Sequence, residues 1–148
     1  MIKKIINKLF DIHPNAMSFK QGLDLTGLPI ISLYQGNKTF NFILDTGSDI
    51  SMVNSYALEQ MEHTKVEGIE GEVYGVDGNR VKSTICTIPL SYKDQSFVSD
   101  FHVRDMSQAF GNLKKDHGVN LHGLLGSQFF NKYRYILDFA ELIAYSKE

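Results

Sequence analysis

One short segment of the sequence could present a reactive carboxylate. The residues from Phe40 to Val53 read FNFILDTGSDISMV, in which an apolar run ends at Asp45 and is followed by Thr46 and Gly47. An apolar strand that leads into a tight turn of small residues presents the aspartate where it can exchange protons with a bound molecule. Asp-Thr-Gly also occurs in ordinary turns, in which the aspartate bonds its own backbone, so the tripeptide alone does not define a site.

A second pattern, an apolar pair between two glycines, lies near the end of the chain: Gly123, Leu124, Leu125 and Gly126. A Gly-containing hairpin at residues 74–79 stands between this motif and the Asp45 loop. This order of elements resembles that of the aspartic peptidases: an apolar strand, the Asp-Thr-Gly loop, a hairpin and then the apolar-pair-Gly motif. The chain has 148 residues and carries only one such loop, and in this it resembles the retroviral-type, retropepsin-like branch of that family. The resemblance covers about residues 28–145.

This resemblance implies an aspartic endopeptidase that works as a homodimer. Two carboxylates within hydrogen-bond reach cannot both ionise at low cost, so they share one proton and act as a unit. The ionised member activates a water, while the protonated member polarises the peptide carbonyl. Because no second Asp is followed by Thr or Ser and then Gly, Asp45 of another copy would complete the pair. The expected substrate is an extended polypeptide, and no metal or other cofactor is expected.

The resemblance also assigns roles to the neighbours of Asp45. Gly47 would let backbone N–H groups approach the carboxylate, and Thr46 would bond across the dimer to the partner's loop. Ser48 is expected to donate its hydroxyl to Asp45, which favours the charged carboxylate and an acidic pH optimum. Asp49 would contact the substrate backbone or, alternatively, serve as a capping or ion-paired carboxylate.

The other expected substrate-binding or supporting residues lie in the hairpin and the second motif: Tyr74, Gly75, Val76, Asp77, Gly78, Leu125 and Gly126. The hairpin would be a flap that closes over bound peptide, or else a plain surface hairpin. In many retroviral-type enzymes an Arg follows the second motif and supports the acidic residue of the loop. Ser127 stands there in this chain, which removes that ion-pair support.

The patterning of the chain predicts the elements that position these residues. Runs rich in β-branched and aromatic residues predict an all-β fold, which the resemblance narrows to a retropepsin-like closed barrel with a flap hairpin and a few short helices. Strands are expected at 29–34, 39–44, 50–53, 72–74, 81–90, 97–103, 133–139 and 142–145, and helices at 54–62, 106–115 and 127–132. In the second of these helices the residues at helical spacing are expected to face the core: Met106, Ala109, Phe110 and Leu113.

Two regions are expected: residues 1–25, an amphipathic helix with its lead-in, and residues 26–148, the barrel domain. The apolar residues of MIKKIINKLF share one helical face, which docks on the protein's own core or dimer, anchors it at a membrane surface, or belongs to an inhibitory pro-segment. Residues 13–27 are expected to form a loop or short strand. The start has no apolar stretch long enough for a signal peptide or membrane span, which predicts a cytoplasmic protein.

Composition argues against several other functions. The 15 basic and 17 acidic residues are interspersed, so no cationic surface is expected to hold nucleic acid. The five histidines show no ligand pair at helical spacing, and no Gly-x-Ser-x-Gly elbow is present, so neither a metal site nor Ser-His-Asp hydrolysis is indicated. Cys86, in an apolar run, is expected to be a buried, inert thiol. The alternative to an enzyme is a non-proteolytic dimer of the same fold that binds peptides or supports assembly.

Overall fold

The computed structural model describes residues 16–74, 78–92 and 94–148, except for the side chains of 67–74 and 81. The helices are α2 (Phe19–Thr26), α3 (Ser55–Leu58), α4 (Ser107–His117) and α5 (Ser127–Lys132). The strands are β1 (Ile30–Gln35), β2 (Lys38–Leu44), β3 (Met52–Asn54), β4 (Thr64–Tyr74), β5 (Arg80–Tyr92), β6 (Gln95–Arg104), β7 (Gly123–Leu125), β8 (Tyr135–Asp138) and β9 (Ile143–Ser146). The amphipathic helix expected at the N-terminus lies outside the described residues.

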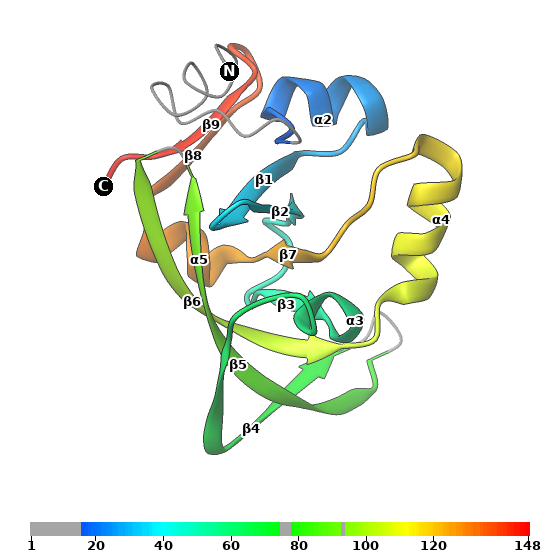
Figure 1. Ribbon diagram of the computed structural model, residues 1–148, viewed down its shortest axis with the longest axis vertical. Coiled ribbons are helices and arrows are strands. Elements are labelled where there is room, and N and C mark those ends of the chain that lie inside the picture. Colours follow the sequence, from blue (N-terminus) through cyan, green and yellow to red (C-terminus); the bar gives the residue numbers. More distant parts are fainter. Residues whose placement is uncertain (1–15, 75–77, 93) are drawn as a thin grey trace.

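Six strands close into a barrel (Figure 1). Neighbouring strands follow the order β1-β2-β7-β3-β6-β5, and a pairing between Tyr34 of β1 and Ser91 of β5 closes the ring. Because β2 and β7 pair in parallel, the strand that ends at the Asp45 loop lies directly beside the strand of the second motif. β8 and β9 form a separate antiparallel pair. This closed, mostly antiparallel arrangement confirms the predicted fold class.

Aromatic and branched side chains fill the barrel. β2 alternates between buried and more exposed positions, which sends Phe40, Phe42 and Leu44 inward. The rings of Phe42 and Phe101 lie 5.7 Å apart between β2 and β6. Cys86 is buried as predicted, and burial raises the pKa of its thiol, which keeps it unreactive.

The helix α4 covers a second, smaller core on β1. Phe110 packs there with Ile30, Val119 and Leu121, and the partly buried Met106 and Leu113 pack against this cluster. The structure thus confirms the predicted core-facing helix, displaced by one or two residues. The prediction is wrong for Ala109, which is exposed although it lies one turn from Met106 and Leu113.

The loop or short strand expected at residues 13–27 is wrong over residues 19–26, which form α2. Ser18 Oγ accepts the Gln21 N–H and Gln21 Oε1 accepts the Ser18 N–H, a reciprocal cap that starts the helix. Gly27 ends the helix in the left-handed region, with φ 73°. Phe19 is buried in the main core, so α2 packs as part of the barrel domain's structure.

The helix expected at residues 54–62 is much shorter than predicted, because α3 ends at Leu58. Asn54 does not cap it with its side chain, and Asn54 Oδ1 accepts the Met106 N–H at 3.0 Å instead. After Leu58 the chain continues in tighter turns, in which Met61 N–H donates to the Leu58 carbonyl. Met61, at the end of these turns, is buried in the main core.

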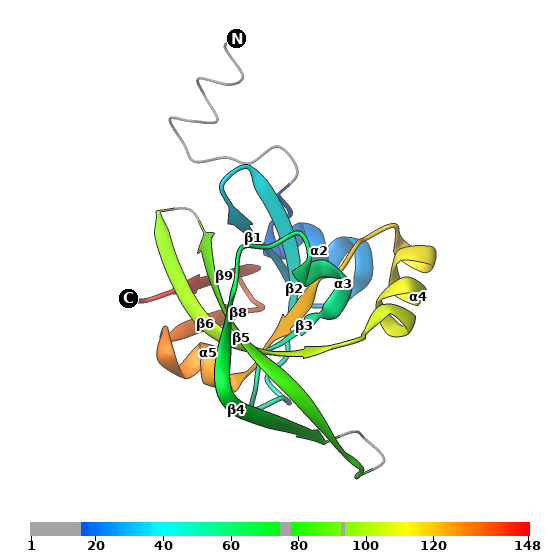
Figure 2. The same ribbon diagram turned by 60° about the horizontal axis from the view of Figure 1, so that its bottom comes forward.

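The strands β4 and β5 form a long two-stranded arm that projects from the barrel (Figure 2). β4 begins at Thr64, well before the predicted residue 72, because its first residues already pair with β5, Thr64 with Thr87. The register pairs Tyr74 with Arg80 at the outer end of the arm. Gly78, two residues before Arg80, has φ 80°, a conformation that glycine adopts without strain. Three residues of the expected flap, Gly75, Val76 and Asp77, lie outside the described residues, so the flap stays a prediction.

The C-terminal elements follow the predicted pattern. α5 has the predicted bounds, β8 lies within the first expected closing strand, and β9 is displaced by one residue from the second, because it ends at Ser146. Tyr133, just after α5, ties this region to β6, because its hydroxyl accepts the Val98 N–H and donates to the Val98 carbonyl, both at 2.8 Å. Among the described residues, no helix combines the length and apolar character needed to cross a membrane.

Candidate active site

Asp45 lies directly after β2, in a loop whose backbone is held at both ends. Its N–H donates to the Leu125 carbonyl at 2.9 Å, and its own carbonyl accepts the Ser48 N–H at 3.2 Å. Asp45 Oδ1 accepts the Gly47 N–H at 3.0 Å. The Asp45 side chain is half-buried, while Thr46 and Gly47 are exposed. The carboxylate is therefore oriented by the loop and still open to a second molecule.

Gly47 allows the close approach that the sequence suggested. An added Cβ at this position would lie 3.3 Å from Asp45 Oδ1, tighter than most real contacts of a Cβ atom. A larger residue would push the carboxylate away from the N–H group that now orients it. The Thr46 side chain lies at the exposed tip of the same turn, where a second copy could reach it.

The two glycines of the second motif stand where no side chain fits. A Cβ on Gly126 would overlap the Ile50 carbonyl oxygen and lie 2.8 Å from the Ser48 carbonyl oxygen. A Cβ on Gly123 would overlap the Met52 carbonyl oxygen. The backbone of β7 therefore packs directly against the Asp45 loop and the strand that follows it.

The loop also provides hydrogen-bond acceptors for the start of α5. Ser127 N–H donates to the Ser48 carbonyl at 2.8 Å, and Gln128 N–H donates to the Asp49 carbonyl at 3.1 Å. The first N–H groups of a helix have no partner within it, so the loop and α5 stabilise each other. Ser127 Oγ donates to the Thr46 carbonyl at 3.3 Å. Ser127 thus supports the backbone of the loop, although it offers no charge to the Asp49 carboxylate.

The expected hydrogen bond from Ser48 to Asp45 is absent from the described loop. Ser48 Oγ donates instead to the Ile50 carbonyl at 2.7 Å. Serine hydroxyls commonly bond backbone groups one or two residues away, and this local acceptor is well placed. In the single chain, the Ser48 hydroxyl stabilises the turn, and the Asp45 carboxylate accepts the Gly47 N–H instead. The expectation of an acidic pH optimum, which depended on a bond from Ser48 to Asp45, therefore loses its basis.

Two buried polar residues that the sequence analysis left without a role hold β7 in place. Ser51 is 1% exposed, and its Oγ accepts the Gly126 N–H at 3.1 Å. His122 Nδ1 accepts the Asn41 N–H at 2.9 Å, while the His122 carbonyl accepts the Asn54 N–H. Burial lowers the pKa of His122, so the neutral ring is favoured. The sequence signal that could have identified Ser51 and His122 is that each is a polar residue within an apolar run.

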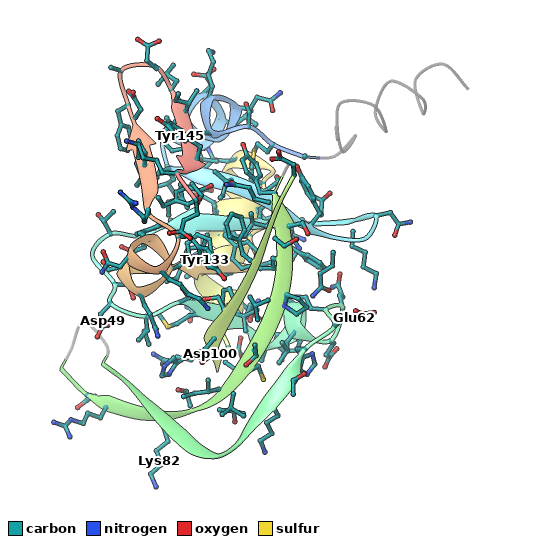
Figure 3. The ribbon with its side chains drawn as sticks, turned by 90° about the vertical axis from the view of Figure 1, so that its left-hand side faces the viewer. Asp49, Glu62, Lys82, Asp100, Tyr133 and Tyr145 are labelled. Atoms are coloured by element: carbon teal, nitrogen blue, oxygen red, sulfur yellow. The ribbon has the colours of Figure 1, made fainter. Side chains whose placement is uncertain are left out.

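Asp49 lies exposed at the end of the loop, and its charge reaches His102 on β6. The backbone N–H of His102 donates to the Ser51 carbonyl at 2.9 Å, and Nδ1 of its ring lies 2.7 Å from Ser83 Oγ. Burial lowers the pKa of His102, and the negative charges of Asp49 and Asp100 act in the opposite direction. Figure 3 labels Asp49 and Asp100, above the β4–β5 arm.

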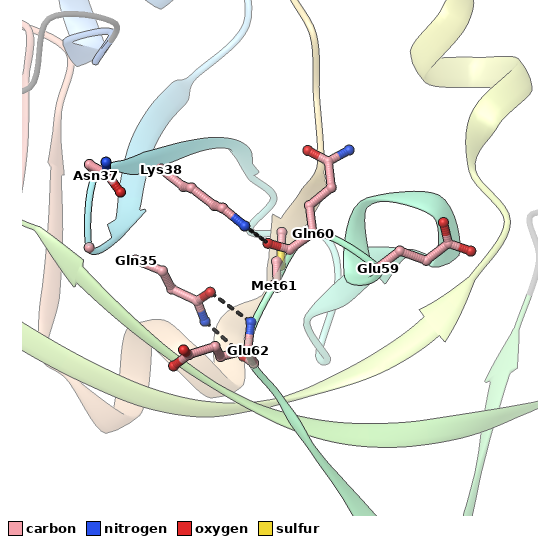
Figure 4. A pocket seen from close by; sticks show the side chains of 8 residues that line it. Gln35, Asn37, Lys38, Glu59, Gln60, Met61 and Glu62 are labelled. Atoms are coloured by element: carbon pink, nitrogen blue, oxygen red, sulfur yellow. Dashed lines mark hydrogen bonds between the residues drawn. The ribbon is translucent and has the colours of Figure 1, made fainter.

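A cavity of about 490 Å³ lies elsewhere, between the β1–β2 turn and the end of α3 (Figure 4). Its lining is polar: Gln35, Gly36, Asn37, Lys38, Glu59, Gln60, Met61 and Glu62. Gln35 bonds the N–H and the carbonyl of Glu62, and Lys38 Nζ donates to the Gln60 carbonyl. None of residues 45–49 lines this cavity, so it is separate from the candidate active site. Within the described part of the chain, no group of three or more His, Cys, Asp and Glu side chains is placed to hold a metal ion.

Comparison with known proteins informs the fold alone. No protein-family model matches the sequence, and no curated protein matches it. The structure is similar to that of the EIAV protease complexed with the inhibitor HBY-793, with a TM-score of 0.54 and 18% sequence identity. The match covers 76% of this chain and 93% of that protease. At this identity, the similarity shows a retropepsin-like fold and leaves activity to be argued from the site.

Proposed function

We propose that the protein is an aspartic endopeptidase that works as a homodimer, with Asp45 of each of two copies forming the catalytic pair. The observation that carries this proposal is the geometry of the loop. A half-exposed carboxylate is oriented by the Gly47 N–H, and the loop that bears it is fixed by β7 and α5. The similarity to a retroviral protease supports the proposal as a fold-level analogy.

The chemistry requires the second copy. Two Asp45 carboxylates held within hydrogen-bond reach share one proton, because their charges repel each other in a partly desolvated site. The ionised member takes a proton from a bound water as the water attacks the peptide carbonyl carbon. The protonated member polarises the carbonyl oxygen and then supplies a proton to the departing nitrogen, so the pair is restored for the next cycle.

The expected substrate is an extended polypeptide bound across the dimer. Such a segment offers backbone hydrogen bonds along its length and side chains on alternate sides. Asp49, which is exposed beside the loop, would receive backbone N–H groups of the substrate, and the β4–β5 arm would close over it. The exposed Thr46 would bond the loop of the second copy.

The test compares wild type with Asp45→Asn on an unfolded protein and a peptide library from acidic to neutral pH. Asp45→Asn keeps the size of the side chain and removes its charge. Cleavage by wild type and its loss in Asp45→Asn, with unchanged folding and dimerisation, is the expected result. Asp116→Asn, on α4 and remote in sequence from the loop, is the matched control and should cleave normally.

Two other outcomes would overturn the proposal. Equal cleavage by wild type and Asp45→Asn would identify a contaminating protease. A stable dimer that binds peptides but cleaves none at any pH would identify a non-proteolytic peptide-binding protein of the same fold.

A further inference from the structure

The two-stranded sheet of β8 and β9 has one face packed on the core and one face that is open in the described part of the chain. The inner face supplies side chains of the main core and its margin: Tyr135, Leu137 and Ala144. Because side chains alternate along a strand, the other positions form the outer face of this hairpin: Ile136, Asp138, Ile143 and Tyr145. The register pairs Ile136 with Tyr145, and Asp138 with Ile143, across the outer face.

The outer face is more apolar than a sheet face that lies against water. Ile143 is 45% exposed and Tyr145 is 38% exposed. Antiparallel sheets with one face in water usually place polar residues on that face. Of the four outer positions only Asp138 is charged, and its Oδ1 accepts the Ala140 and Glu141 N–H groups within the turn. This composition is typical of a sheet that is covered on both faces, and exposed apolar clusters commonly mark a contact surface.

The N-terminal part of the chain joins the described structure beside this hairpin. Phe19, in the first turn of α2, packs edge-on against Phe139 in the β8–β9 turn, with 5.4 Å between the ring centroids. α2 also contacts β9, and the two elements lie side by side in Figure 1. Residues 11–15, which lie outside the described residues, can span up to roughly 17 Å when extended. The ten residues that precede them can therefore reach the outer face.

The first ten residues match the outer face in hydrophobicity and in charge. In the sequence MIKKIINKLF the apolar residues recur at helical spacing: Ile2, Ile5, Ile6, Leu9 and Phe10. So short a helix is marginal in water by itself and needs a surface on which its apolar face can pack. Its lysines can lie near Asp138 and Glu141 at the turn end of the hairpin, where opposite charges attract. The basic residues of the hairpin, Arg134 and Lys147, lie at its other end.

We propose that residues 1–10 form a helix whose apolar face covers the outer face of the β8–β9 hairpin in the same chain. This cover buries Ile143 and Tyr145, and it keeps the same apolar residues from binding a membrane surface or a second copy. β8 follows α5, whose first N–H groups bond the Asp45 loop, so the cover stabilises the part of the fold that holds the loop. The inference does not depend on cleavage activity, because it concerns the packing of the chain on itself.

The test places a spin label on the full chain through Asn7→Cys, on the polar side of the expected helix. Cys86 is buried and is not expected to take the label. NMR should then show paramagnetic broadening of the Ile143 and Tyr145 amide resonances. The Lys82 resonance should stay sharp, because Figure 3 places Lys82 at the opposite end of the molecule from Tyr145. A labelled chain in which neither hairpin resonance broadens would overturn the proposal.

Two substitutions at one position of the apolar face test how the segment binds. Ile6→Asp in the labelled chain should remove the broadening, because a charge would have to be buried against the hairpin. The matched control Ile6→Val keeps an apolar side chain and should retain the broadening. Ile6→Asp should also lower the urea concentration at which half of the protein is unfolded, whereas Ile6→Val should change it little. Broadening that persists in Ile6→Asp would contradict packing through the apolar face.

Dilution distinguishes the same chain from a second copy. The labelled, isotope-enriched protein is mixed with an excess of protein that carries neither label, under conditions in which subunits exchange. Broadening within one chain should persist, whereas its loss on dilution would show that the segment covers a second copy and would overturn the proposal. If the undiluted sample shows no broadening but the chain binds vesicles of phosphatidylcholine and phosphatidylserine, the segment is a membrane-surface anchor and the proposal is equally refuted.

Discussion

Replacing Gly126 with alanine tests whether β7 positions the Asp45 loop. The new Cβ would overlap the Ile50 carbonyl oxygen and lie 2.8 Å from that of Ser48. Both are backbone atoms, which cannot rotate away as the end of a flexible side chain could. Relief requires the loop to move off β7, and this strains the hydrogen bonds from the Asp45 N–H to the Leu125 carbonyl and from the Ser127 N–H to the Ser48 carbonyl.

The expected cost is that of forcing extra volume into a packed site, about 1–3 kcal/mol. For a chain of this length, each 1 kcal/mol lowers the melting temperature by about 2–4 °C, so a fall of roughly 2–12 °C is expected. Urea denaturation measures the free energy of unfolding, and NMR shifts of Gly47 and Ser48 report displacement of the loop. Cleavage should fall further than the loss of folded protein explains.

Gly111→Ala is the matched control. Gly111 lies within α4, where an added Cβ meets nothing within 4 Å. Alanine in a helix interior is favoured over glycine by about 0.5–1 kcal/mol, so this variant should gain stability and keep its loop resonances. If Gly126→Ala is as stable as wild type and its loop resonances do not move, the loop is not held by close packing on β7 and the reasoning is refuted.

Three further substitutions test individual contacts. Tyr135→Phe removes a buried hydroxyl that has no hydrogen-bond partner among the described residues, so urea denaturation should show an unchanged or higher stability, by up to about 1 kcal/mol. A clear loss of stability would mean that the hydroxyl has a partner. Tyr133→Phe removes both bonds to Val98 and should cost about 0.5–1.5 kcal/mol, whereas no loss would show that water replaces them fully. Burial lowers the pKa of His122 below its ordinary 6.5, so the unfolded chain binds the proton more tightly and the protein should lose stability as pH falls below 6.5. His122→Gln should reduce this pH dependence of the free energy of unfolding, measured by urea denaturation. An unchanged pH dependence in the variant would contradict this reasoning.

Much of the fold could be predicted because the strands carry a strong local pattern. The alternation in β2 and the Gly36-Asn37 turn before it predict a hairpin, and the register pairs Gln35 with Lys38 across that turn. α2 was missed although its cap, Ser18 with Gln21, is a local signal, because Gly22 and Gly27 made the segment resemble a loop. α3 was predicted to continue to residue 62, but it ends at Leu58 and Met61 is buried in the main core, a tertiary contact that leaves no local signal.

Some features of the candidate site could likewise be predicted from the sequence, and others depend on the folded structure. The Asp45 loop and Gly123–Gly126 could be recognised from short motifs, because close backbone approach restricts which residues fit there. The bond from Ser48 to Ile50 competes with a bond to Asp45 only once the turn is formed, so residue type does not decide between them. The position of His102 opposite Met52 depends on the pairing of β3 with β6, which joins segments about 50 residues apart and leaves no local signal.

The central claim is that each active site needs Asp45 from two copies. The most direct measurement mixes wild type with Asp45→Asn at constant total protein, under conditions in which subunits exchange, and follows peptide cleavage. With equal amounts and random pairing, about a quarter of the dimers hold two aspartates, so activity should fall to about a quarter of the all-wild-type value and vary as the square of the wild-type fraction. Activity that falls to about half, in proportion to the wild-type fraction, would show that one Asp45 suffices and would contradict the shared pair.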